Sequence, residues 1–119
     1  MQEIDLSRTP VREANELLRK LGEDGVTEVA IENPDARHHI GVGLVAPMTV
    51  HVRGSAGYFC AGLTDGARFE IENNAGWGLG DNIYNGTVIV GGNAGAIAGV
   101  AIRGAEIAPQ GTRVVPYDG

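Results

Sequence analysis

A pattern that recurs every 19 residues constrains the fold of this chain more than any other feature. Alternating apolar residues open three copies of the pattern, which begin at Val50, Phe69 and Val88. An earlier copy begins at Val29, 21 residues before the first of these, and Ile107 lies 19 residues beyond the last. Apolar residues at every second position indicate strands with one buried face. A repeat of this length indicates a row of similar structural units.

Each copy continues with a turn and then with a second, shorter apolar stretch. In the three later copies the turn ends in Ala-Gly and is preceded by Gly, Asn or Ser, which tolerate the backbone conformations of tight turns. The second stretches cover residues 58–63, 77–83 and 96–102. One such coil cannot bury its own inner face, so successive coils must stack. We therefore predict an all-β fold, a right-handed single-stranded β-helix that forms a solenoid of coils about 19 residues long.

A left-handed β-helix built from hexapeptides is the closest structural alternative. It requires a sub-period of six residues, and spacings of 19 and 21 residues are not multiples of six. The spacing therefore favours the right-handed form with irregular turns.

Glycine accounts for 19 of the 119 residues, which is about twice its usual share. Because 43% of the residues are apolar, disorder does not explain this excess. The repeat instead predicts that glycines form the corners of the coils. The glycines expected at these corners are Gly57, Gly66, Gly76, Gly78, Gly80, Gly86, Gly95 and Gly104.

The first 25 residues differ from the remainder and are expected to form a separate N-terminal segment, before a β-helix domain over residues 26–119. Residues 10–21 are predicted to be a short amphipathic helix, with Thr9 as its cap, Pro10 at its first position and Gly22 at its end. The apolar face of this helix consists of Val11, Ala14, Leu17, Leu18 and Leu21.

Three charged residues occupy equivalent outward positions in successive copies. They are Glu32, Arg53 and Glu72. Stacked coils would place them about 4.8 Å apart, so we expect a ladder of alternating charge that helps to fix the register of the coils.

The charge and cysteine content narrow the possible partners and location. Nine Lys and Arg residues against 15 Asp and Glu give a net charge of -6, which argues against nucleic acid and anionic membranes as partners. No apolar run is long enough to span a membrane. A single cysteine fits a reducing compartment, and we expect a cytoplasmic protein.

The residues that could carry chemistry do not form a recognisable catalytic group. His38 and His39 are neighbours, which on a strand would point to opposite sides and could not easily share a metal. Cys60 has no base placed beside it, and His51 stands alone on the outer face of its strand. The glycines of residues 41–43 imitate a dinucleotide-binding motif, but Pro47 follows where that motif requires a helix. We therefore assign no catalytic, cofactor-binding or metal-binding residue to this chain.

The repeat resembles the GXGXG domain family, whose namesake motif the chain carries as Gly76-Trp77-Gly78-Leu79-Gly80. Similar copies lie at residues 54–62 and 92–99, and the segments 3–10 and 40–50 are similar to the start of the free-standing members. The resemblance covers residues 3–107. The family forms the C-terminal β-helix of the glutamate synthase large subunit, the C subunit of formylmethanofuran dehydrogenase, and a free-standing subunit of N-methylglutamate synthase-type complexes. The chain looks most similar to the last group.

This resemblance implies a non-catalytic scaffold subunit in a hetero-oligomer. Its partners would be a glutamine amidotransferase-like chain and a synthase chain that holds FMN and an iron–sulfur cluster, so this chain itself would hold no cofactor. We expect the outward-facing Ile89 to lie on the docking surface, together with Tyr58 and Trp77 if they too face outward. One alternative is the equivalent scaffold of a formylmethanofuran dehydrogenase or formyltransferase–hydrolase complex.

A second alternative is a free-standing β-helix that binds a small molecule. Its candidate polar groups are Asp81, Asn82, His38 and Cys60.

Overall fold

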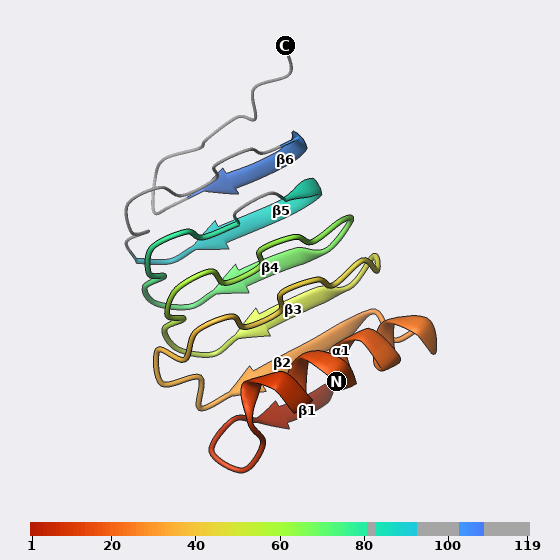
Figure 1. Cartoon of the computed structure of the whole chain (residues 1–119), viewed down its shortest axis with the longest axis vertical. Helices are drawn as coiled ribbons and strands as arrows, with labels where there is room; N and C mark the ends of the chain where they lie inside the picture. The colour runs from red at the N-terminus through yellow and green to blue at the C-terminus, as the bar shows by residue number, and fades with distance from the viewer. Residues whose placement is uncertain (81–82, 93–102, 109–119) are drawn as a thin grey trace.

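The computed structural model describes residues 1–80, 83–92 and 103–108, and its six strands form a single sheet in chain order. All neighbouring strands in this sheet are parallel. They stack as a β-solenoid of about three turns (Figure 1), which confirms the solenoid predicted from the repeat. The strands are β1 (Gln2–Asp5), β2 (Glu28–Glu32), β3 (Thr49–Val52), β4 (Arg68–Ile71), β5 (Tyr84–Val90) and β6 (Arg103–Ala108).

The register of the sheet follows the sequence repeat. Val29 pairs with Val50, Val50 with Phe69, Phe69 with Val88, and Val88 with Ile107. The predicted alignment of the copies is therefore confirmed across β2 to β6. The first four of these side chains are fully buried, because they point into the solenoid and form its core. A second buried column, two residues further along each strand, consists of Ile4, Ile31, Val52, Ile71 and Val90.

The N-terminal segment adds a strand to the same sheet. β1 pairs in parallel with β2 and buries Ile4 against the core. Among the described residues one helix forms, α1 (Val11–Glu23), and it lies at the N-terminal end of the stack (Figure 1). It buries Ala14 and Leu18 in the core, whereas Leu17 is 40% exposed despite its predicted place on the apolar face. β1 and α1 together close the first turn of the solenoid.

Both ends of α1 differ from the prediction. Pro10 occupies the N-cap position, where no side chain caps the helix, so Thr9 does not have its expected role. At the other end the helix continues through Gly22 to Glu23. A Cβ on Gly22 would lie 2.6 Å from the Cβ of Ala46, so this glycine permits close packing of α1 on the solenoid. The chain leaves the helix at Gly25, which has a φ of 83°.

The glycines expected at corners occupy two kinds of position. Between strands lie Gly57, Gly66, Gly76, Gly78 and Gly80. Gly86 and Gly104, in contrast, lie within β5 and β6, so their prediction as turn residues was wrong. A Cβ on Gly86 would collide with the carbonyl oxygen of Ala67 in the coil before it. Close approach of two backbones, together with a φ of 144° that favours glycine, explains this residue. Gly95 is outside the described residues.

The charge ladder is present in part. Arg53 forms an ion pair with Glu32, as predicted, and its guanidinium also lies 3.8 Å from Glu3 on β1. Within the described part of the chain it makes no such pair with Glu72. Exposed pairs of this kind contribute only about 0–1 kcal/mol each, so their main effect is to favour one register.

Candidate functional site

The connecting segments after β2, β3 and β4 share an unusual backbone. Over a short stretch of each one, every second residue has a positive φ, which L-residues other than glycine rarely adopt. These residues are His39, Gly41 and Gly43 in the first segment, Phe59, Ala61 and Leu63 in the second, and Gly78 and Gly80 in the third. This alternation explains the last two glycines of the motif, Gly78 and Gly80. At its first glycine, Gly76, a Cβ would lie 2.9 Å from the backbone of Gly57 in the coil before it. Residues 41–43, which imitate a dinucleotide-binding motif, lie between β2 and β3, and no helix follows them there.

Backbone hydrogen bonds join these segments from coil to coil. The N–H of His39 donates to the carbonyl of Tyr58 at 2.7 Å, and the N–H of Phe59 donates to the carbonyl of Trp77 at 2.9 Å. The N–H of Gly80 donates in the opposite direction, to the carbonyl of Cys60 at 2.8 Å. The side chains of equivalent residues are therefore held one above another.

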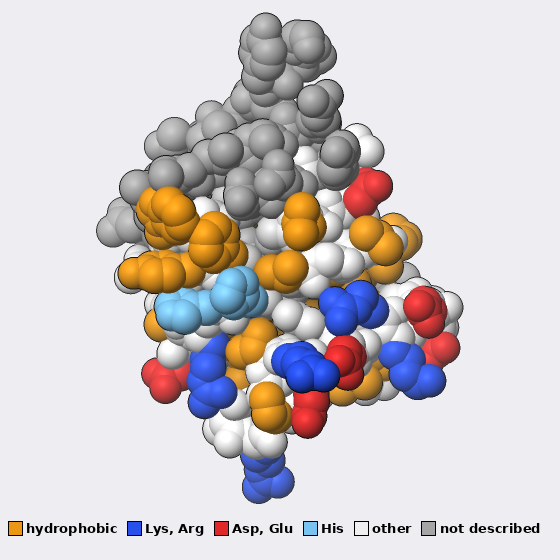
Figure 2. Space-filling view, viewed as in Figure 1, with side chains coloured by type: hydrophobic (Ala, Val, Ile, Leu, Met, Phe, Trp, Pro, Cys, Tyr) orange, Lys and Arg blue, Asp and Glu red, His pale blue; other side chains and the backbone are white. Residues whose placement is uncertain are grey.

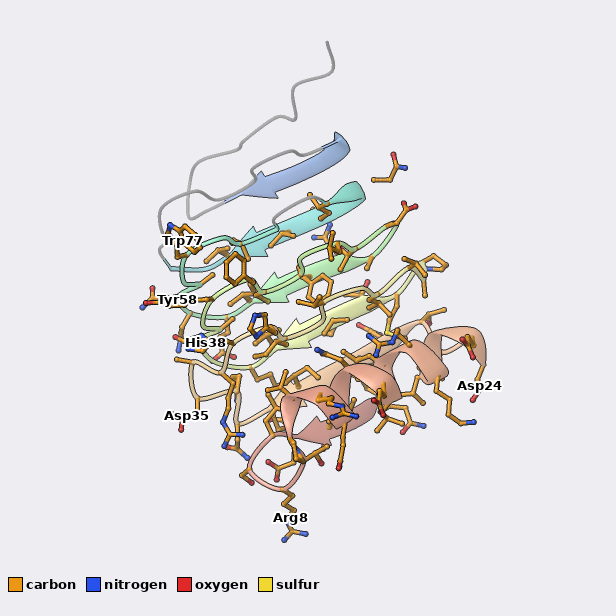
Figure 3. The ribbon with its side chains drawn as sticks, viewed as in Figure 1. Arg8, Asp24, Asp35, His38, Tyr58 and Trp77 are labelled. Carbon is orange, nitrogen blue, oxygen red and sulfur yellow. The ribbon has the colours of Figure 1, made fainter. Side chains whose placement is uncertain are left out.

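A column of exposed rings results from this register. The imidazole of His38 stacks on the ring of Tyr58, with centroids 4.5 Å apart, and Trp77 meets Tyr58 edge-on at 6.4 Å. Figure 3 shows these three side chains one above another along one edge of the stack. Tyr58 is 51% exposed and Trp77 is 41% exposed. We call His38, Tyr58 and Trp77 the ring column.

A second pair of rings supports the column. His39 and Phe59 stack with their planes 9° apart and their centroids 5.7 Å apart, and Phe59 meets the indole of Trp77 edge-on at 5.1 Å. A Cβ on Gly78 would lie 2.6 Å from the Phe59 ring. The glycine at position 78 therefore makes room for the ring that supports Trp77.

The imidazole of His38 is fixed in one tautomer. Its Nδ1 accepts a hydrogen bond from the N–H of Tyr58 at 2.8 Å, so the proton of the neutral ring resides on Nε2. The two neighbouring histidines lie in a turn, with ring centroids 6.4 Å apart and planes nearly perpendicular. Among the described residues, no group of three His, Cys, Asp or Glu side chains is arranged to hold a metal ion.

Helix α1 packs against the first connecting segment through Asn15. The amide nitrogen of Asn15 donates to the carbonyl of His39 at 2.7 Å, and its Oδ1 accepts from the N–H of Gly41 at 2.7 Å. In later coils, the N–H equivalent to that of Gly41 bonds to the backbone of the coil before it: Ala61 to Ile40, and Gly80 to Cys60. Asn15 therefore replaces the backbone of a preceding coil at the end of the stack.

A shallow groove separates α1 from the same segment. It has a volume of about 300 Å³, and its polar lining includes Arg12, Arg19, His38 and His39. Arg19 crosses the groove to donate to the carbonyl of Val42 at 3.1 Å. Figure 2 shows histidine side chains with a group of hydrophobic side chains on one side and Lys or Arg side chains on the other. We call this the cationic groove.

The remaining candidate residues lie elsewhere. Cys60 is completely buried, and burial raises the pKa of its thiol to about 12. It is therefore part of the core and is not accessible as a nucleophile. Asp81 and Asn82 are outside the described residues. Within the described part, no helix combines the length and apolar character needed to cross a membrane.

The outer face of the sheet carries a second polar cluster. We had expected His51 to stand alone there, and this was wrong. Its Nε2 lies 2.7 Å from Glu28 and its Nδ1 lies 3.7 Å from Glu70. Ile89 lies in the same shallow hollow, beside His51 and Glu70. The three residues expected on one docking surface are thus divided, since Tyr58 and Trp77 belong to the connecting segments and Ile89 to the sheet.

Some residues of the site could have been predicted from the sequence, and others could not. The spacing of 20 residues from His38 to Tyr58 and of 19 from Tyr58 to Trp77 would have revealed the ring column once the copies were aligned across the turns. Asn15 lies on the buried side of α1, but the groups that it binds are backbone atoms and leave no pattern in the sequence.

The chain is thus a parallel β-solenoid with a helix at its first turn and a column of exposed rings along one edge. It is 38% identical over 92 residues to Protein GlxC from Rhizobium meliloti (strain 1021). This alignment covers 76% of the present chain and 40% of GlxC, so the chain spans less than half the length of that relative. The two proteins are related in sequence over most of this chain. No family model and no solved structure matches the chain.

Proposed function

We propose that this chain is a non-catalytic scaffold subunit of a glutamate-synthase-like complex. In this proposal it is a member of the GXGXG family closest to the free-standing subunits of N-methylglutamate synthase-type complexes. It docks a glutamine amidotransferase-like chain and a synthase chain, and the synthase chain holds the FMN and the iron–sulfur cluster. The complex is cytoplasmic, in keeping with a single cysteine that is buried as a thiol.

This proposal rests on the packing around two glycines, Gly78 of the motif and Gly41 of the first connecting segment. A Cβ on Gly78 would meet the Phe59 ring, and one on Gly41 would meet the Phe69 ring. Glycines that cradle a ligand leave open space above their backbone, whereas these two are covered by side chains of the protein itself. The motif therefore builds the solenoid, which supports a structural role for the repeat.

The polar contacts of the sheet support the same interpretation. Arg53 pairs with Glu32, and His51 pairs with Glu28, on neighbouring strands. Arg68 donates to Glu70 along β4 at 2.8 Å. These polar side chains bind one another across and along the strands, as expected of groups that stabilise the stack.

Isolation of the native complex tests the proposal. The full chain, expressed with an affinity tag in its own cell, should co-purify with larger chains whose fraction contains flavin and iron. Recovery of the tagged chain as a lone, stable monomer would refute the scaffold function. A complex that lacks flavin would refute the glutamate-synthase-like assignment and favour the scaffold of a formylmethanofuran dehydrogenase.

A pair of matched variants tests the docking surface. Changing both Tyr58 and Trp77 to Ala should remove the partners from the purified fraction, because large exposed rings contribute most to protein interfaces. Changing Leu17 and Val45 to Ala removes apolar side chains that are 40% and 70% exposed, and should leave the complex intact. Equal effects of the two double variants would argue against a specific role for the rings.

A further inference from the structure

The ring column and the cationic groove form one continuous surface, because His38 belongs to both. We propose that this surface binds an acidic segment of a partner protein that also carries apolar side chains. The inference rests on the proposed scaffold function and specifies the chemistry of one partner segment. The acidic residues of that segment lie in the cationic groove, and its apolar residues pack on Tyr58 and Trp77.

The charge of the groove is opposite to that of the chain. The protein has a net charge of -6, yet the charged side chains that line this groove are two arginines, and no Asp or Glu lines it. The groove is therefore a local site of positive potential on an acidic protein, where a carboxylate gains the most from binding.

The two arginines are arranged to receive carboxylates. The side chain of Arg12 is 91% exposed, and its ion pair with Glu16 is long, at 3.7 Å. Such an exposed pair contributes little, so Arg12 can exchange Glu16 for another carboxylate at little cost. Arg19 is held in place by its bond to Val42 and retains further guanidinium N–H groups as donors. The tautomer of His38 adds an Nε2–H donor at the boundary with the ring column.

The ring column provides the apolar part of the surface. Tyr58 and Trp77 are exposed, and their rings are held in position by contacts with His38 and Phe59. Because these rings are already ordered, a partner that packs on them loses less conformational entropy than it would on free side chains. Trp, Tyr and Arg are the residues most enriched among the strongest contacts of protein interfaces.

A protein segment suits this surface better than a nucleic acid does. Single-stranded nucleic acid also stacks on aromatic rings, but it requires a positive groove that follows a long, repeatedly charged backbone. Here the positive site is a short groove of about 300 Å³ on an acidic chain, and the ring column leads away from it. A few carboxylates followed by apolar side chains match this arrangement.

Trp77 supplies a direct measurement of binding, since it is the only tryptophan in the chain. The probe is a synthetic peptide of about ten residues with four Glu followed by two Phe. We expect it to change the fluorescence of Trp77 and to bind more weakly as salt is raised, because exposed charges are screened. Two control peptides, one with Lys in place of Glu and one with Ala in place of Phe, should bind much more weakly.

Two charge reversals on the same helix form the matched comparison. R12E places a negative charge in the groove and should weaken peptide binding roughly 3- to 10-fold, from the loss of an exposed pair and added repulsion. K20E makes the same change in net charge at an exposed position outside the groove, and should leave binding nearly unchanged. R12Q provides a milder change, with an expected loss of about two- to fivefold, and circular dichroism checks that each variant is folded.

Several results would overturn the inference. It fails if R12E and K20E have equal effects, or if the Lys peptide or an oligouridylate binds as well as the acidic peptide. It also fails, while the scaffold function stands, if the native complex forms and R12E neither weakens peptide binding nor releases any partner. Failure of the wild-type chain to recover partners would refute the scaffold function, and the peptide measurement would still decide the chemistry of the surface.

Discussion

Asn15 of helix α1 binds Gly41 through its side-chain oxygen and closes the open end of the first connecting segment. Its amide nitrogen binds the neighbouring carbonyl of His39, so one side chain satisfies two backbone groups. Solenoids require a specialised structure at the end of the stack, because the outermost coil would otherwise expose its backbone and core. In this protein the helix closes that end, and Asn15 provides the hydrogen bonds that a further coil would have made.

Replacing Asn15 by Ala should lower the free energy of unfolding by about 1–3 kcal/mol, because a buried N–H and a carbonyl lose their partner. Urea denaturation followed by circular dichroism measures this loss. Glu16→Ala, one position further along α1 at an exposed site, is the matched control and should change stability by less than about 0.5 kcal/mol. A stable Asn15→Ala variant would show that α1 is held mainly by its apolar contacts.

Gly78→Ala should destabilise the protein more than Gly66→Ala does. Both glycines have a positive φ, of 75° and 85°, so both substitutions carry a similar backbone strain of about 1–2 kcal/mol. Only at position 78 would the new methyl group meet the Phe59 ring, since nothing lies within 4 Å of a Cβ at position 66. The difference between the two variants, expected to be about 1–3 kcal/mol, measures the cost of this contact.

Removing the Phe59 ring tests the cause of that difference. In a protein that already carries Phe59→Ala, the additional loss caused by Gly78→Ala should fall toward that of Gly66→Ala. If the two glycine variants lose equal stability in the original background, backbone strain alone explains the motif at position 78.

Asp5 makes the protein sensitive to acid. Hydrogen bonds from the side chain of Ser7, from Asn33 and from the backbone of Ser7 lower the pKa of Asp5 from 3.8 to about 2. Because the pKa is lower in the folded state, the stabilisation is complete above about pH 4 and is lost as the pH falls toward about 2. Asp5→Asn should therefore lose less stability than the wild type over this range, as measured by urea denaturation at each pH. Parallel curves for the two proteins would contradict this role of Asp5.

Cys60 should react with thiol reagents only when the solenoid opens. Its side chain is buried, and the pKa of its thiol is raised to about 12, so the reactive thiolate is scarce in the folded state. Labelling with a chromogenic disulfide at about pH 8 should be slow in buffer and fast in denaturing urea. Equally fast labelling in the two conditions would show that residues 58–63 open readily or that the coil is packed differently.

The parts of the fold that obey the 19-residue repeat were predictable from the sequence. Val29, Val50, Phe69 and Val88 align because each opens a run of alternating apolar residues, and burial of one face fixes the register. β1 was missed because only four residues form it, too few to show alternation, and because a helix separates it from the first copy.

The errors at α1 and at Gly86 have a common physical cause. Gly22 was interpreted as a helix stop and Gly86 as a corner, yet both provide space for another part of the chain, Ala46 in one case and Ala67 in the other. Glycine has the same appearance in a sequence whether it is needed for its backbone angles or for its lack of a side chain. The neighbour that requires the space is known only once the fold is built.

The candidate site was predicted in part. Tyr58 and Trp77 were expected on the docking surface if they faced outward, and both are exposed; their role in docking stays a prediction. The contact of Tyr58 with His38 was not foreseen, because the histidine was considered only with its neighbour in sequence. The role of Arg12 and Arg19 depends on how α1 lies against residues 38–44, which a repeat pattern in the strands cannot specify.

The strict pairing of Val50, Phe69 and Val88 has a consequence for how such a protein can change in length. Removal or addition of one residue between two strands would move every later side chain out of its column and turn apolar residues toward water. A whole coil of 19 residues can be gained or lost with all columns preserved. The coil that begins at Val29 shows how a different length is tolerated, since its 21 residues keep Val29 in register with Val50 and place Asn33, Asp35 and Ala36 in left-handed conformations at the turn. The chain length of such a solenoid therefore changes in steps of one coil, and smaller insertions or deletions are confined to the turns between strands.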